Sequence, residues 1–127
     1  MTTPRRPTPA ELEILRLLWE FGPSTVREVQ GRIEQQRPAG YTTVLKLLQI
    51  MTEKGLVRRD ETTRAHVYSA RAPEDQTQRQ LVGDFLDRVF GGSATKLVMH
   101  ALSARKATPE ELAGIRELLD KFEEGEK

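Results

Sequence analysis

The sequence predicts a mainly α-helical chain with one small β-hairpin, and three observations indicate this fold class. Apolar residues recur at spacings of three and four in three stretches within residues 9–54, which is the period of helices with one buried face. From residue 56 to residue 70 the pattern changes to short alternating runs around a polar turn, as in a hairpin. Three more helical stretches follow after residue 73.

The first helix is expected over residues 9–21. Thr8 is placed as its N-cap, Pro9 occupies the first helical position and Glu11 completes a capping box. Gly22 and Pro23 end the helix. Its core face consists of Leu12, Ile14, Leu15, Leu18 and Trp19.

Two further helices complete the N-terminal set. Ser24 is expected to cap the second, over residues 25–35, and the third is expected from residue 41 or 42 to Lys54. Gly55 follows as its C-terminal cap, because glycine enters the left-handed conformation without penalty. The buried stripe of the second helix is Val26, Val29 and Ile33, and that of the third is Val44, Leu47, Leu48 and Met51.

The hairpin is expected to join strands 56–60 and 66–70 through a polar loop that carries Arg64. Three short helices followed by a hairpin is the order of elements in a winged helix-turn-helix. Such a fold places its third helix in the DNA major groove, where outward side chains near the helix N-terminus meet base edges. The outward positions of the third helix are Thr42, Thr43, Lys46, Gln49 and Ile50, and Tyr41 at its start is also assigned to the DNA-binding residues.

These side chains suit DNA. The short hydroxyls of Thr42 and Thr43 allow close approach to phosphates, Lys46 can donate to guanine or to a phosphate, and Gln49 can read adenine. The predicted DNA-binding set is completed by hairpin cations that can hold the flanking backbone, Arg58, Arg59 and Arg64.

The C-terminal part, residues 73–127, is expected to be a helical dimerisation domain that follows a DNA-binding domain over residues 1–72. Its helices are predicted over 73–90, 93–103 and 108–123, and their apolar faces exceed what a small winged helix can cover. The residues predicted to form the dimer interface are Leu81, Phe85, Leu86, Val89, Leu97, Leu102, Ile115, Leu118 and Phe122.

Composition excludes several classes of protein. There is no cysteine, which rules out disulfide frameworks and thiolate metal sites, and no apolar run long enough for a membrane span or a signal segment. Residues 1–72 carry 12 Lys/Arg and 8 Asp/Glu, whereas residues 73–127 carry 8 and 11, so the mildly basic half is the one suited to a polyanion. His66 and His100 lack metal-ligand spacing, so no metal and no cofactor is expected. The chain is expected to be cytoplasmic, with which the absence of cysteine is compatible.

Two alternatives remain open from the residues alone. The winged helix could be a protein-interaction module without sequence-specific DNA binding, which a flat or acidic third-helix face would favour. An enzyme would need a pocket lined by titratable groups, but the sequence contains no nucleophile elbow, phosphate loop or paired carboxylates that would indicate one.

Several segments in order resemble the penicillinase repressor family (the BlaI/MecI/CopY type). They are Glu11–Trp19, Gly22–Val29, Tyr41–Val44, Glu53–Val57 with Val67-Tyr68, Gly91-Gly92, Lys96–Met99 and Pro109–Leu112. The resemblance covers about residues 7–121. It implies a winged-helix DNA-binding domain, a helical dimerisation domain and repression of antibiotic-resistance or stress genes at an inverted-repeat operator.

The resemblance also carries expectations about individual residues. It implies DNA contacts at Thr42, Thr43 and Lys46, and it places Ile50 where relatives often have arginine. It implies derepression by proteolysis, triggered by a membrane sensor-protease, at a bond corresponding to His100–Ala101, although these two residues differ from those of the family. The copper site of the copper-sensing relatives cannot exist in a chain without cysteine.

Overall fold

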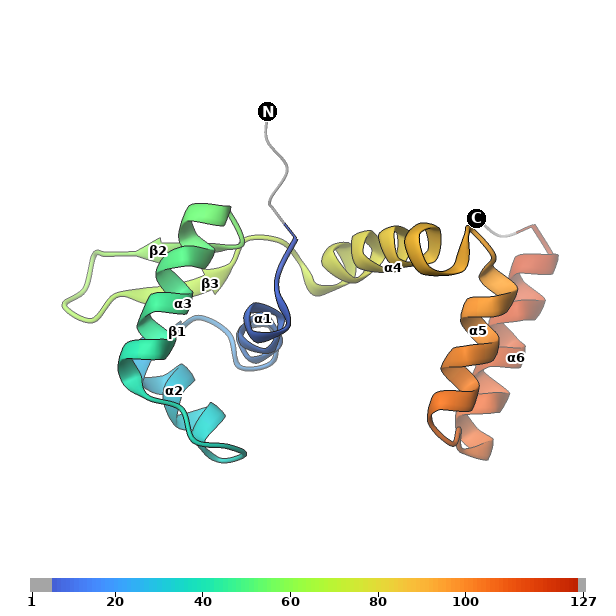
Figure 1. Ribbon diagram of the computed structural model, residues 1–127, viewed down its shortest axis with the longest axis horizontal. Coiled ribbons are helices and arrows are strands. Elements are labelled where there is room, and N and C mark those ends of the chain that lie inside the picture. The colour runs from blue at the N-terminus through green and yellow to red at the C-terminus, as the bar shows by residue number, and fades with distance from the viewer. Residues whose placement is uncertain (1–5, 126–127) are drawn as a thin grey trace. The chain divides into compact units, whose positions relative to one another are not determined.

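The computed structural model describes residues 6–125 and divides the chain into two compact units, residues 1–82 and 83–127 (Figure 1). The two units are separated within one helix, α4 (Glu74–Phe90). The elements before it are α1 (Pro9–Phe21), β1 (Ser24–Thr25), α2 (Val26–Glu34), α3 (Tyr41–Lys54), β2 (Val57–Asp60) and β3 (Val67–Ala70). The class predicted from the sequence, helices with a small β wing, is confirmed.

The local signals at the ends of α1 and α3 act as predicted. The Thr8 hydroxyl accepts from the Glu11 amide, and the Glu11 carboxylate accepts from the Thr8 amide, which completes the capping box of α1. At the C-terminal end of α3, Gly55 adopts φ 81° and ψ 15°, a left-handed conformation that ends the helix. Both helices therefore have the bounds that these residues predict.

The start of α2 corrects one prediction. Ser24 is not its cap: Ser24 lies in β1, and the cap is Thr25, which forms a capping box with Glu28. The Gly22-Pro23 turn brings the chain out in an extended conformation, so that Ser24 pairs with Tyr68 and Thr25 pairs with Val67. The sheet is consequently a three-stranded antiparallel one in the order β1-β3-β2, with one strand more than the predicted hairpin.

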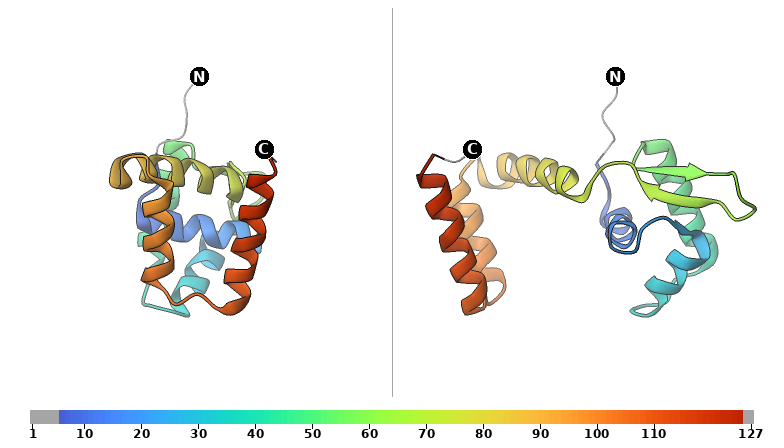
Figure 2. Two further views of the ribbon diagram at one scale, coloured as in Figure 1. Left: turned by 90° about the vertical axis from the view of Figure 1, so that its right-hand side faces the viewer. Right: turned by 180° about the vertical axis from the view of Figure 1, so that it is seen from behind.

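The core of the first unit lies where the three helices meet the sheet, and Figure 2 shows α3 beside the β2–β3 hairpin. Tyr68, at the centre of β3, is 1% exposed and anchors the sheet to the helices. Trp19 closes the edge of this core by donating its indole N–H to the Ala72 carbonyl at 2.9 Å. The buried apolar residues are Ile14, Leu15, Leu18, Val26, Val29, Ile33, Val44, Leu48, Met51, Leu56, Val57 and Tyr68.

The second unit comprises the rest of α4 together with α5 (Ala94–Ala104) and α6 (Pro109–Glu123). These three helices agree with the predicted ranges to within one residue, and Thr108 and Glu111 form the predicted capping box of α6. The helices α5 and α6 run in opposite directions from a short connection (Figure 2). No apolar side chain among the described residues 83–125 is buried, so this unit has no closed core of its own.

Candidate nucleic-acid interface

The outward face of α3 carries the residues that the sequence assigns to DNA. Four of the five predicted outward side chains are exposed, and the fifth, Ile50, is half-buried; Tyr41, at the start of the helix, is exposed as well. The opposite face is held in the core by Val44, Leu48 and Met51, so the orientation of the helix about its axis is determined by packing. The exposed side chains are Tyr41, Thr42, Thr43, Lys46 and Gln49.

The first turn of α3 is open to a ligand. Its N-cap is Gly40, which has no side chain to accept from the first amides of the helix. Amides at a helix N-terminus attract anions, because they are unpaired donors and lie at the positive end of the helix dipole. The hydroxyls of Thr42 and Thr43 lie in the same turn, so this end of the helix suits contact with a phosphate backbone.

The wing presents two of its three predicted arginines. Arg58 and Arg64 are exposed and form no ion pair within residues 6–125. Arg59 is engaged inside the wing instead: its Nε lies 2.6 Å from a carboxylate oxygen of Glu61. A hydrogen bond to Tyr68 and the charge of Glu61 raise the pKa of Arg59 above its ordinary value. Arg59 thus stabilises the hairpin, whereas Arg58 and Arg64 are the cations available to a partner.

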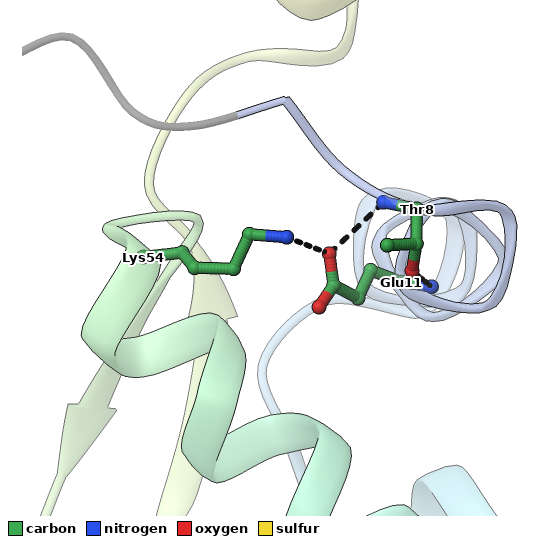
Figure 3. Close-up of polar contacts among 3 residues, drawn as sticks. All are labelled: Thr8, Glu11 and Lys54. Carbon is green, nitrogen blue, oxygen red and sulfur yellow. Dashed lines mark hydrogen bonds and ion pairs between the residues drawn. The ribbon is translucent and has the colours of Figure 1, made fainter.

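A buried ion pair fixes the far end of α3 (Figure 3). The Lys54 ammonium lies 2.6 Å from the same Glu11 oxygen that accepts from the Thr8 amide, and the two side chains are 13% and 3% exposed. Burial alone would raise the pKa of Glu11, but the bonds from Lys54 and Thr8 outweigh it and hold the pKa below its ordinary value. Lys54 therefore ties α3 to α1. Sequence reasoning found the capping role of Glu11 and missed this pair, since its partners are 43 residues apart.

A second missed contact lies at the near end of α3. The guanidinium of Arg27, in the first turn of α2, stacks over the Tyr41 ring at 4.9 Å from its centroid. Arg27 is exposed, and nothing in the local sequence distinguishes it from an ordinary solvated arginine. The stack links the first turns of the two helices that form the helix-turn-helix.

The predicted dimerisation residues fall into two groups. Four of them are more than half exposed: Phe85, Val89, Leu118 and Phe122. The other five are half-buried, namely Leu81, Leu86, Leu97, Leu102 and Ile115. Four further large apolar residues of α4, α5 and α6 are exposed and were not in the predicted set: Val82, Val98, Met99 and Leu119.

The bond predicted to be cleaved lies in the interior of α5. His100 and Ala101 are both helical and exposed, and the His100 ring lies 5.6 Å from that of Phe90, centroid to centroid. An intact helix presents no extended backbone, so a protease could use this bond only after α5 opens locally.

The described residues meet the requirements of neither a metal site nor a membrane span. No group of His, Asp and Glu side chains within residues 6–125 could hold a metal ion, and none of the helices described there is long and apolar enough to cross a membrane.

The chain is similar to known proteins of one family. The family model of the penicillinase repressor matches residues 7–121. The chain is similar to the penicillinase repressor of Staphylococcus aureus, with 20% identity over 87% of this chain and 88% of that protein. It is 29% identical to the transcriptional regulator BlaI of Mycobacterium tuberculosis, over 91% of this chain and 83% of the relative.

Similarity extends to the methicillin resistance regulatory protein MecI of Mammaliicoccus sciuri, at 20% identity over 88% of this chain and 91% of that protein. Members of this group are transcriptional regulators and not enzymes. With a match that spans most of the chain and a winged helix that presents the expected face, this protein belongs to the penicillinase repressor (BlaI/MecI) family.

Proposed function

We propose that this chain is a cytoplasmic homodimeric repressor that binds an inverted-repeat operator and blocks transcription. The observation that carries the proposal is the exposed face of α3, with Thr42, Thr43 and Lys46 in its first two turns, on a member of a repressor family. The wing cations Arg58 and Arg64 supply contacts to the flanking backbone, which position the protein without reading sequence.

The first test is a mobility shift with the DNA upstream of the chain's own gene and with a random duplex, at several salt concentrations. Tight, salt-dependent binding to one inverted repeat is expected. Equal binding to both duplexes would contradict operator recognition and would favour a winged helix that serves a protein partner.

Variants assign the contacts within the interface. Lys46→Ala should weaken operator binding by about 1–3 kcal/mol if Lys46 reads a base, with a smaller effect on the random duplex. Arg64→Ala should weaken binding to both duplexes by the same factor and flatten the salt slope. Arg16→Ala, which removes one exposed cation from α1, is the charge-matched control and should change neither.

The dimer is proposed from the apolar surface of the second unit. Phe85, Val89, Leu118 and Phe122 leave half or more of their surface in solvent in a single chain, and a second copy would remove that surface from water. Two α3 helices held in this way would read half-sites about one helical turn apart, or a multiple of it. Analytical ultracentrifugation should give a dimer at micromolar concentration, and Leu118→Glu with Phe122→Glu should give a monomer that binds the operator more weakly. A monomeric parent chain would refute the dimer.

Derepression is proposed to follow from cleavage between His100 and Ala101 by a membrane sensor-protease. Neither residue is buried, and α5 has no buried side chain, so local opening of this helix breaks few packing contacts. The mass of the chain recovered from cells exposed to a β-lactam antibiotic tests this step. A fragment ending at His100 is expected, and an intact chain together with full induction would exclude cleavage as the signal.

A further inference from the structure

The local electrostatics of α2 do not account for Arg27. It is the second residue of the helix, where the helix dipole disfavours a positive charge. The adjacent Glu28 directs its carboxylate to the Thr25 amide. Within residues 6–125, Arg27 forms no ion pair, whereas Arg37 and Arg59 do. A cation held against the dipole, with no carboxylate paired to it among the described residues, is a local cost that suggests an external anion.

The Tyr41 ring holds this cation in place. With the guanidinium carbon 4.9 Å from the ring centroid, Arg27 is within the range of a cation–π contact. Such a contact leaves donor N–H groups at the edge of the guanidinium free, and these match two oxygens of one phosphate. Since the ring already restrains the side chain, binding an anion would cost less conformational entropy than it would for a freely rotating arginine.

The position of the stack indicates which anion would reach it. Tyr41 is 40% exposed and begins α3, directly before the exposed hydroxyls of Thr42 and Thr43. A duplex that places base edges against those residues would bring its sugar-phosphate backbone past the first turn of the same helix.

We propose that Arg27, oriented by Tyr41, binds a backbone phosphate of the DNA next to the bases met by α3. This inference rests on the proposed DNA-binding function and adds to it a residue outside both the recognition helix and the wing. The contact supplies affinity without reading sequence.

The test is a salt titration of duplex binding by the full-length chain. Arg27→Met keeps a stem that can pack on Tyr41 and removes the charge. It is expected to lower affinity for operator and random duplex by the same factor, about tenfold at 0.1 M salt, and to reduce the slope of log K against log salt by about 0.9. Arg27→Lys keeps the charge but loses the planar stack, so the slope should stay close to that of the parent while affinity falls for both duplexes. Arg16→Met is the charge-matched control and should reproduce the parent.

Folding is monitored in the same samples. Because Arg27→Met removes a cation from the start of α2, the urea midpoint should be unchanged or higher, which separates a lost contact from a damaged fold. A parental slope and affinity for Arg27→Met would refute the contact while leaving operator binding intact. Loss of operator binding alone, with random-duplex binding preserved, would also refute it, because a phosphate contact acts on both. A parent chain that binds no duplex would overturn both the proposed function and this inference.

Discussion

Replacement of Lys54 by methionine is the most direct test of what holds α3 in place against α1. The ammonium lies 2.6 Å from the Glu11 carboxylate, and that carboxylate is 3% exposed. Methionine retains much of the aliphatic stem and removes the charge. The Thr8 amide and the Lys54 ammonium both donate to one oxygen of Glu11. In the variant, only the Thr8 amide would remain as a donor to that oxygen.

The magnitude follows from this geometry. A buried acceptor that loses a partner costs about 1–3 kcal/mol of unfolding free energy, and the lost cation in the last turn of α3 adds about 0.3–1 kcal/mol through the helix dipole. We expect Lys54→Met to lower the free energy of unfolding by about 2 kcal/mol. Adding Glu11→Gln should recover much of it, because glutamine has no charge to leave unpaired and still serves a capping box.

Trp19 makes the measurement specific to the first unit. It is the one tryptophan of the chain, and its indole bonds to Ala72 within that unit, so its fluorescence in urea follows the unfolding of the winged helix. Lys46→Met, an exposed lysine of the same helix, is the control and should change stability by less than about 0.5 kcal/mol.

The pH dependence supplies the refutation. The folded pKa of Glu11 lies below the ordinary value of 4.5, so the pair contributes fully above pH 4.5 and its contribution is lost as the pH falls through the folded value. Removal of Lys54 also takes away bonds that lower the pKa of Glu11, so the gap between parent and Lys54→Met should be largest near pH 7 and shrink as acid protonates Glu11. Equal stabilities at pH 7, or a gap that persists undiminished at pH 3, would show that the reasoning is wrong.

Three further predictions concern local features of the fold. Gly55→Ala forces an L side chain to φ 81° and should lower the free energy of unfolding by about 1–2 kcal/mol. Gly31→Ala lies in the interior of α2 with open space around its Cβ and should raise that free energy by about 0.5–1 kcal/mol. Trp19 fluorescence in urea measures both variants, and lower stability in both would contradict the conformational argument. Tyr68→Phe removes the hydroxyl that bonds to Arg59 and should lower the urea midpoint, although by less than Lys54→Met does. Tyr41→Phe is the control and should leave the midpoint unchanged. If Tyr68→Phe had no more effect than Tyr41→Phe, the contact with Arg59 would not support the wing. Thr108→Ala removes the capping box of α6 and should reduce helix stability by about 1 kcal/mol, seen as an earlier loss of helical circular dichroism; an unchanged transition would exclude the cap as a contributor.

The parts of the fold that follow from neighbouring residues were predictable. The capping box of Thr8 with Glu11 and the glycine at position 55 set the bounds of α1 and α3, because each signal acts within one turn of the chain. The exposed face of α3 also followed, since the spacing of Val44, Leu48 and Met51 determines which side packs inward.

The contacts that sequence reasoning missed are those between distant residues. The strand β1 has two residues, too few to show a period, and it exists because Ser24 pairs with Tyr68. The Glu11–Lys54 pair and the Arg27–Tyr41 stack each join two helices, and an ordinary charged side chain carries no sign of its partner. The engagement of Arg59 by Tyr68 and Glu61 depends on the register of the wing in the same way.

The absence of buried apolar side chains among residues 83–125 bears on gene dosage. In the proposed dimer a second copy would cover this surface, and the amount of dimer would then depend on the square of the chain concentration when that concentration is below the dissociation constant. Loss of half the chains would then remove about three quarters of the dimers. Under the proposed function, removal of only part of the chains would therefore lower operator occupancy more than in proportion to the loss.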